Sequence, residues 1–343
     1  MVDASFPSRF GEDCVPSYPI LPRFNIEKRL NPSRMLRNRW DGAASKEGFS
    51  VSEYRIVRMC MHAAFSGMLI LCCARAQNKA VTTQYGANPT AGHYLRVDDA
   101  NIYYETYGSG GTPLVLLHGG LYGYIEEFGE LIEELSKHRR VIAIATRGHG
   151  KSDLGTKPFS YALFANDAFA VIHHETGDKV DVLGFSDGAV TSYTLASTHP
   201  ELIRRLVAIS GSRKFTDSTP SAQAEFKNAK PSDVERDSPQ FVLNRKKLMP
   251  QPERWLEFNE KLHTMWAGPV YVTDAQIQSI KVPTLIVAGD HDPHNPVPMV
   301  GELFQLLPKG ELAIIPGCGH VVLACKGQFT INAVELFLDQ QER

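Results

Sequence analysis

The sequence has almost no excess charge, because 36 lysine and arginine residues are balanced by 38 aspartate and glutamate residues, for a formal net charge of −2. Nucleic acids and anionic membrane surfaces attract proteins through clustered positive charge, so neither partner is indicated. The apolar stretch at residues 63–73 is too short to cross a bilayer, so no stable membrane span is expected. What is present is an ordinary globular composition over 343 residues, 43% of them hydrophobic, enough for one large domain or two smaller ones.

Cysteine is also sparse, with six residues in the chain, four of them in its first quarter. Their spacing matches no structural metal site. Cys318 and Cys325 lie in the part of the chain that looks folded, and they leave two alternatives open. They form either a short-loop disulfide, which an oxidising compartment would permit, or a pair of buried free thiols.

The first 92 residues contain little that predicts a folded domain. Residues 1–58 show no sustained period of 3.6 or 2, so they are expected to have little order or to belong to a mis-assigned start of the chain. Arg55 and Arg58, the apolar run at residues 63–73 and the small residues at 74–76 are the charged, apolar and small-residue parts of a secretory signal. Residues 59–76 are therefore a candidate signal peptide, which predicts a secreted or periplasmic protein. The alternative is a hydrophobic segment in an unstructured extension of a cytoplasmic protein. Residues 77–92 are expected to form a linker.

From residue 93 to the end of the chain, apolar runs alternate with helical patterns. The expected strands lie at residues 100–107, 114–117, 141–145, 180–185, 206–209, 285–288 and 312–315. The expected helices lie at residues 125–137, 161–176, 189–199, 297–307 and 328–340. Several of these strands are continuously apolar, as strands buried on both faces must be, which predicts a doubly wound, parallel α/β sheet. The alternation breaks between about residues 214 and 275, which predicts an inserted helical cap.

A candidate nucleophile stands between an expected strand and an expected helix, in the pentapeptide Gly184-Phe185-Ser186-Asp187-Gly188. A serine on a sharp strand-to-helix turn projects its hydroxyl clear of the sheet, and glycines two residues to either side avoid clashes with it. The pentapeptide alone could be a structural turn, since Gly48-Phe49-Ser50 repeats its first three residues without such context. The strand before it and the helix after it favour a catalytic Ser186.

A serine nucleophile needs a histidine to take its proton and a carboxylate to orient that histidine. His320 follows the last expected strand through a glycine-containing loop, which favours it as the base over His294. Asp292 follows the preceding strand and is preferred as the acid over Asp290, which directly follows the strand end. The expected triad is Ser186, His320 and Asp292.

The tetrahedral intermediate of acyl transfer requires backbone N–H donors directed at its oxyanion. One expected donor is the amide of Asp187, next to the nucleophile. The second is the amide of Gly120 or Leu121, in the small-residue turn after the strand at residues 114–117.

Five motifs together resemble the α/β-hydrolase superfamily over about residues 94–340. They are His118-Gly119-Gly120, Arg147-Gly148-His149-Gly150-Lys151-Ser152, Gly184-Phe185-Ser186-Asp187-Gly188, Gly289-Asp290-His291-Asp292 and Gly317-Cys318-Gly319-His320. The resemblance implies a mostly parallel eight-stranded sheet, and it is nearest to small esterases, lactonases and carbon-carbon hydrolases with a Ser-Asp-Gly elbow. One departure is Ala145, where relatives commonly carry Asp, a change that puts the bracing of Arg147 in doubt.

The expected activity is therefore cleavage of small ester-like substrates through an acyl-enzyme. A lactonase or a carbon-carbon hydrolase on the same triad is an alternative, and so is a non-catalytic ligand receptor of the same fold. Serine at position 186, where dehalogenases and epoxide hydrolases carry aspartate, argues against those two activities. The partner is expected to be a small molecule, and nothing in the sequence sets the oligomeric state.

Two features bear on the substrate. Asp187 either recognises a cationic substrate group or is a carboxylate favoured at a helix start. In the expected cap, Trp255, Phe258 and Trp266 recur at helical spacing, which indicates either simple packing or an apolar substrate pocket.

Metal and cofactor chemistry have weak support in the sequence. Asp290, His291, Asp292 and His294 form a dense, ligand-like cluster. Nothing else completes its ligand set, so no metal is expected. The glycine-rich turns are accounted for by the elbow and the oxyanion loop, so no organic cofactor is expected.

Overall fold

The computed structural model describes residues 83–341. The candidate signal segment at residues 59–76 and the extension before it lie outside this range. No helix of the described part is long and apolar enough to cross a membrane.

The described residues form one eight-stranded sheet in the order β1-β2-β4-β3-β5-β6-β7-β8. The strands are β1 (Gly92–Val97), β2 (Ala100–Tyr107), β3 (Leu114–Leu117), β4 (Val141–Ile144), β5 (Val180–Phe185), β6 (Ile203–Ile209), β7 (Thr284–Gly289) and β8 (Gly310–Ile315). The β1–β2 and β2–β4 pairs are antiparallel, and the remaining pairs are parallel. The predicted mostly parallel, eight-stranded sheet is confirmed.

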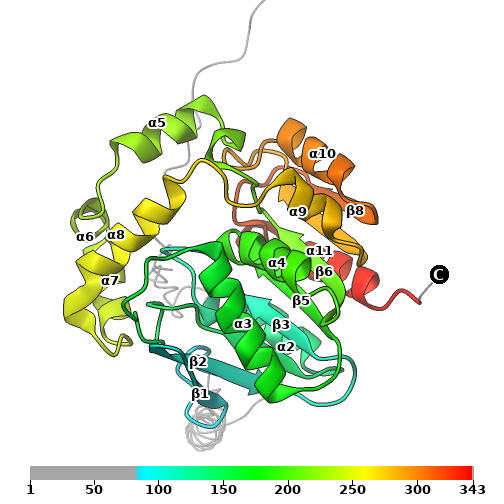
Figure 1. Ribbon diagram of the computed structural model, residues 1–343, viewed down its shortest axis with the longest axis horizontal. Coiled ribbons are helices and arrows are strands. Elements are labelled where there is room, and N and C mark those ends of the chain that lie inside the picture. Colours follow the sequence, from blue (N-terminus) through cyan, green and yellow to red (C-terminus); the bar gives the residue numbers. More distant parts are fainter. Residues whose placement is uncertain (1–82, 342–343) are drawn as a thin grey trace, which may run out of the picture. The chain divides into compact units, whose positions relative to one another are not determined.

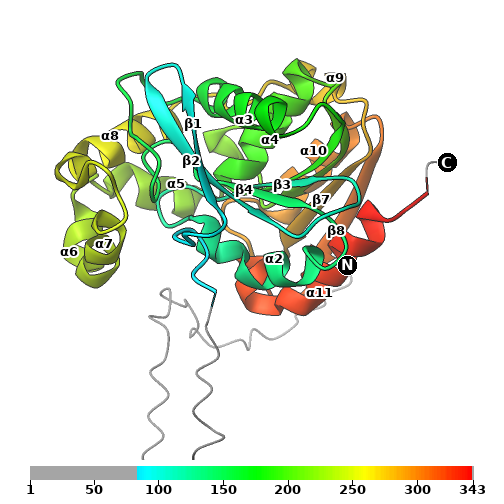
Figure 2. The same ribbon diagram turned by 90° about the horizontal axis from the view of Figure 1, so that it is seen from below.

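Helices cover both faces of this sheet (Figure 2). One face carries α2 (Gly129–Leu135) and α11 (Val322–Leu338), and the other carries α3 (Tyr161–Glu175), α4 (Asp187–Thr198), α9 (Asp274–Ser279) and α10 (Val297–Leu306). Strand β3 is buried on both faces. Val115 and Leu117 pack into one core cluster, and Leu114 and Leu116 pack into the other. Successive side chains of a strand point to opposite faces, so a strand covered on both sides is apolar at every position.

A helical segment separates β6 from β7. It contains η3 (Phe215–Asp217), α5 (Pro220–Asn228), α6 (Asp233–Asp237), α7 (Pro239–Lys246), η4 (Pro252–Arg254) and α8 (Trp255–Trp266), followed by α9. Helices α5 to α8 gather beside the sheet rather than on its covered faces (Figure 1). Helix α9 belongs to the layer that covers the sheet, because it packs against α4 and α10.

The helix expected at residues 125–137 is divided into a 3-10 helix, η2 (Ile125–Phe128), and α2, and two further elements differ from the sequence-based expectation. Strand β1 was not among the expected apolar runs, because it pairs at the edge of the sheet and most of its side chains are exposed or half-buried. Helix α11 begins at Val322 rather than near residue 328, and its path is interrupted at Lys326, where φ is −140° and ψ is 61°.

Candidate active site

Ser186 lies on a sharp turn between β5 and α4, with a φ of +54° and a ψ of −117°. This left-handed backbone is costly for a non-glycine residue and is held by close packing on both sides. A Cβ atom at Gly184 would lie 2.2 Å from the Gly188 carbonyl oxygen, and one at Gly188 would lie 1.9 Å from the Leu117 carbonyl oxygen. The two glycines therefore permit the approach of strands and turn that lifts the Ser186 side chain above the sheet edge.

The structure brings Ser186, His320 and Asp292 together from three different loops. Ser186 Oγ lies 2.9 Å from His320 Nε2, and His320 Nδ1 lies 2.9 Å from Asp292 Oδ2. With Nδ1–H donating to the carboxylate, Nε2 carries the free lone pair and accepts the serine hydroxyl. This is the geometry in which a histidine can remove the proton of a serine.

Asp292 is 2% exposed and receives hydrogen bonds on both carboxylate oxygens. The His294 N–H donates to Oδ1, and Asn295 Nδ2 donates to Oδ2 beside His320. Burial raises the pKa of Asp292, but the charges and hydrogen bonds of His320 and His294 together outweigh it, so the pKa is lowered overall. Asp292 is thus held as a carboxylate.

Asp290, the alternative acid, lies elsewhere in the same loop. Its Oδ1 contacts His291 Nδ1 at 2.8 Å and accepts the Cys318 N–H at 3.1 Å. Asp290 therefore braces the loop that leads to His320. The carboxylate that contacts the His320 imidazole is that of Asp292.

The turn after β3 is held by His118. The Thr146 N–H donates to His118 Nε2, so the ring proton is on Nδ1, which donates to the Gly119 carbonyl at 2.7 Å. Burial lowers the pKa of His118 to about 4, which keeps the ring neutral at pH 7. The Gly119 N–H donates to Glu127 Oε1 at 2.7 Å, so both backbone groups of Gly119 are fixed.

The candidate oxyanion donors lie next to this turn. The Gly120 and Leu121 amides donate no hydrogen bond to another group of the described chain. The Asp187 amide is the first of α4, and N–H groups in the first turn of a helix have no partner within the helix. These donors remain available to a substrate oxygen.

The Asp187 carboxylate points inward, against the turn, and is held by two aromatic donors. Trp266 Nε1 in α8 lies 2.8 and 3.0 Å from its two oxygens, and the Tyr161 hydroxyl donates to Oδ1 at 2.8 Å. A Cβ atom on Gly120 would lie 2.4 Å from Asp187 Oδ2. Burial raises the pKa of Asp187, and the hydrogen bonds from Trp266 and Tyr161 oppose this shift only in part.

The three aromatic residues proposed for a substrate pocket lie in different surroundings. Trp266 is half-buried and contacts the elbow through Asp187. Trp255 and Phe258 are 3% and 1% exposed and pack against each other in a tilted arrangement, with ring centroids 5.4 Å apart. Phe258 also packs edge-on against His149, so it joins α8 to the body of the domain.

Arg147 is fully buried and is braced without an acidic residue at position 145. Its Nε and Nη2 donate to Asp167 at 2.5 and 2.9 Å, and its Nη1 pairs with Asp99. Ala145 instead contributes a backbone hydrogen bond to the Tyr103 carbonyl. Two carboxylates from other segments thus supply the bracing that the sequence left in doubt.

Sequence reasoning missed Glu127 and Tyr161, which contact the oxyanion turn and Asp187. Neither lies in a motif, and each reaches the site only through the packing of its helix.

Cys318 and Cys325 form a disulfide, which decides between the two alternatives left open by the sequence. Within residues 83–341, no group of three or more His, Cys, Asp or Glu side chains is placed to hold a metal ion.

Replacing Glu127 with glutamine is expected to change how stability depends on pH. Burial raises the pKa of Glu127 from 4.5 to about 8, so between these values the native state keeps a proton that the unfolded chain has lost. Over this window the wild type therefore loses up to about 1.4 kcal/mol of unfolding free energy per pH unit from this group. The glutamine variant keeps an acceptor for the Gly119 N–H and lacks this loss. Its stability relative to the wild type should rise from pH 5 to pH 8.

Urea unfolding at pH 5, 6.5 and 8 measures this difference. Glu133→Gln, at an exposed position of α2, is the matched control and should run parallel to the wild type. A constant difference between Glu127→Gln and the wild type would mean that Glu127 ionises in the folded protein as it does in the unfolded chain.

Comparison with known proteins places these features in a family. A family model described as "Alpha/beta hydrolase family" matches residues 114–326. A Haemophilus influenzae protein with a provisional esterase/lipase name is 26% identical over 253 residues, covering 67% of this chain and 84% of that protein. The 2-(acetamidomethylene)succinate hydrolase of Mesorhizobium japonicum is 24% identical over 280 residues, covering 74% and 98%. The crystal structure of the serine hydrolase CarC, involved in carbazole degradation, has a similar fold, with a TM-score of 0.60 at 22% identity over 73% of this chain and 99% of that one.

Proposed function

This chain belongs to the alpha/beta hydrolase family, and on that premise we propose that it is a serine hydrolase that cleaves small ester-like substrates through an acyl-enzyme on Ser186. The observation that carries the proposal is the continuous contact from Ser186 Oγ to His320 Nε2 and from His320 Nδ1 to Asp292, each step 2.9 Å long. A histidine in this position converts a poor nucleophile into an effective one.

In the first half-reaction, Ser186 Oγ attacks the substrate carbonyl carbon while its proton moves to His320 Nε2. The carbonyl oxygen becomes an oxyanion and accepts hydrogen bonds from the amide of Asp187 and that of Gly120 or Leu121. His320 then gives its proton to the leaving alkoxide, which departs as an alcohol and leaves the acyl group on Ser186.

In the second half-reaction, water replaces the alcohol. His320 takes a proton from the water, the hydroxide adds to the acyl carbon, and the proton returns to Ser186 as the carboxylic acid leaves. Throughout, Asp292 stabilises the positive charge on the imidazolium and holds the tautomer that presents Nε2 to the serine. A lactone follows the same steps, with the alcohol and acid remaining in one product.

We place the acyl group beside the elbow, next to Trp266. The Trp266 indole, which is bonded to Asp187, lies close to the turn at Gly120. Asp187 carries its carboxylate inside this region, so uncharged or cationic acyl groups are favoured over anionic ones, which its negative charge would repel.

The site of action is proposed to be an oxidising compartment outside the cytoplasm. The Cys318–Cys325 disulfide supports this, because reducing systems keep most cytoplasmic thiols free. The candidate signal segment at residues 59–76, which points the same way, lies outside the described residues.

A fluorophosphonate probe tests the function directly, because it phosphonylates only a serine that is activated as a nucleophile. The wild type and Ser221→Ala, an exposed serine of α5, should both be labelled, whereas Ser186→Ala should not. Peptide mapping should place the adduct on Ser186. A folded wild type that resists the probe and turns over no aryl ester or lactone would overturn the proposal and favour a ligand receptor.

A further inference from the structure

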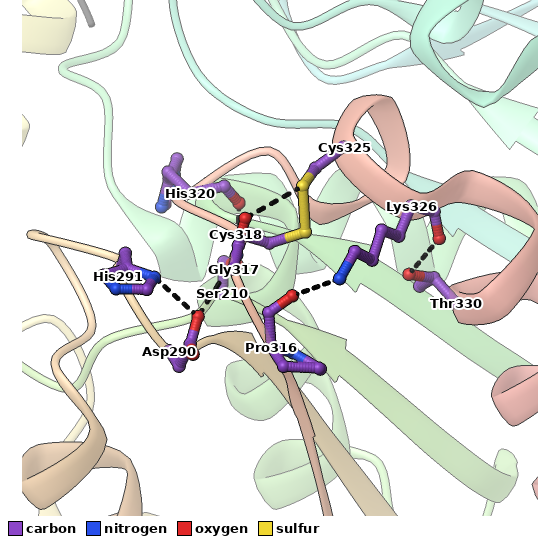
Figure 3. The surroundings of a disulfide bond; sticks show 10 residues. All are labelled: Ser210, Asp290, His291, Pro316, Gly317, Cys318, His320, Cys325, Lys326 and Thr330. Atoms are coloured by element: carbon purple, nitrogen blue, oxygen red, sulfur yellow. Dashed lines mark hydrogen bonds and ion pairs between the residues drawn. A yellow bond between two sulfur atoms is a disulfide. The ribbon is translucent and has the colours of Figure 1, made fainter. Parts of the chain in front are cut away.

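The disulfide between Cys318 and Cys325 encloses the candidate base. The two cysteines are seven positions apart, and His320 lies in the covalent ring that they close (Figure 3). We call residues 318–325, which this disulfide closes, the disulfide loop. We propose that the Cys318–Cys325 disulfide is a positioning element that holds His320 against Ser186 and Asp292, so that a thiol reductant converts the enzyme to a slow form. This inference rests on the proposed serine hydrolase function.

The Cys318 end of the disulfide loop is anchored to the sheet. Cys318 is 1% exposed; its carbonyl accepts the His291 N–H at 2.9 Å, and its N–H donates to Asp290. A Cβ atom at Gly289 would lie 2.2 Å from the Cys318 carbonyl oxygen, so the disulfide loop begins in close contact with the end of β7. This end is fixed whether or not the disulfide is present.

The other end is held by Val322, which is fully buried in the core cluster beneath α2 and α11, and the chain then turns out to the surface. The turn from Val322 to Cys325 is separated from the rest of α11 by the non-helical backbone of Lys326, and Cys325 itself is exposed. Lys326, which follows Cys325, donates from Nζ to the Pro316 carbonyl at 2.5 Å, just before the Cys318 end of the disulfide loop (Figure 3). Beyond Val322, the Cys325 N–H donates to the Val321 carbonyl, and the lysine bond and the disulfide tie the exposed end of the turn back to the Cys318 end.

The position of His320 depends on this closure. Ser210 Oγ donates to the His320 carbonyl at 2.9 Å, and the His320 side chain spans Asp292 and Ser186. Without the disulfide, non-covalent contacts at Cys318, Val322 and Lys326 alone hold the segment that carries His320, and the imidazole then samples positions outside hydrogen-bond reach of the serine more often. Proton transfer requires placement within a fraction of an ångström, so the loss falls on kcat.

The exposure of the two sulfurs sets the route of reduction. A dithiol thiolate attacks the exposed Cys325 Sγ, the S–S bond breaks, and Cys318 leaves as a thiolate that takes a proton. The second thiol of the reductant then closes on its own sulfur and releases Cys325. Two protein thiols and one cyclic disulfide result, so the protein gains two electrons and two protons and the dithiol loses them.

The experiment compares the full chain before and after dithiothreitol treatment, at 25 °C, with an aryl ester as substrate. Iodoacetamide and peptide mass mapping report which cysteines are free, and circular dichroism reports that the protein is folded. Reduction at Cys318 and Cys325 should lower kcat and the rate of fluorophosphonate labelling by roughly 10- to 100-fold, while KM changes by less than about 2-fold. Reoxidation with oxidised glutathione should restore both rates.

The Cys318→Ala/Cys325→Ala variant is the matched control, since it keeps the four cysteines of the first quarter of the chain. It should have the activity of the reduced wild type and should not respond to dithiothreitol. Should it fail to fold, reduction of the folded wild type still decides. Unchanged kcat in wild type whose Cys318 and Cys325 thiols are both alkylated overturns this inference alone. Absence of labelling in the oxidised wild type overturns the proposed function.

Discussion

Ser186→Ala is expected to lower kcat for acyl substrates by roughly 10⁴- to 10⁶-fold. The variant removes the only atom that can form the acyl-enzyme in the proposed mechanism, while the amides of Asp187 and Gly120 still bind a carbonyl oxygen. KM should therefore change little. Steady-state kinetics on an aryl ester, with wild type and variant purified in parallel, measures both parameters.

The alanine variant should also be folded, because the elbow is held by Gly184 and Gly188 and not by the serine hydroxyl. Ser221→Ala again serves as the control and should retain wild-type kcat. Turnover by Ser186→Ala within tenfold of the wild type would mean that the nucleophile is a different group, and the acyl-enzyme mechanism would have to be abandoned.

Asp292→Asn is expected to lower kcat by roughly 10³- to 10⁴-fold. Oδ1 accepts the His294 N–H, and Oδ2 accepts His320 Nδ1 and Asn295 Nδ2. Both oxygens face donors, so either orientation of the asparagine directs its NH₂ group at a donor. The strain is relieved if His320 moves its proton to Nε2, and that tautomer cannot accept the proton of Ser186.

Asp290→Asn is the matched control for this prediction. Asp290 is next but one in sequence, but its carboxylate contacts His291 and the Cys318 N–H rather than the His320 ring. Its replacement should leave kcat within about tenfold of the wild type, since it acts through the loop alone. A large loss in Asp290→Asn with near-normal activity in Asp292→Asn would transfer the role of acid to Asp290.

The sheet could be predicted from the sequence because its inner strands are buried on both faces. A run such as residues 114–117 has no polar position, and burial on both faces requires that pattern whatever the neighbouring strands are. Strand β1 escaped prediction for the opposite reason. It lies at the edge, most of its side chains are exposed or half-buried, and its place is set by pairing with β2 rather than by an apolar run.

The candidate site divides in the same way. The elbow around Ser186 could be found in the sequence because its requirements are local: a strand, a tight turn with small residues, and a helix. The direction of the Asp187 side chain could not, because it is fixed by Trp266, 79 positions away, and by Tyr161. Glu127 carries no sequence signal at all, since its effect depends on burial beside the Gly119 amide.

The sequence by itself determined the alternation of strands and helices and the elbow around Ser186. Both follow from short-range preferences and from which residues must be buried, whereas the candidate order of serine, acid and histidine came from the resemblance to α/β-hydrolases. Only the tertiary structure decided that His320 reaches Ser186 across 134 positions, that Asp187 turns inward, and that Cys318 and Cys325 are joined. These features depend on contacts between segments that the chain brings together only on folding, and no local pattern encodes such distances.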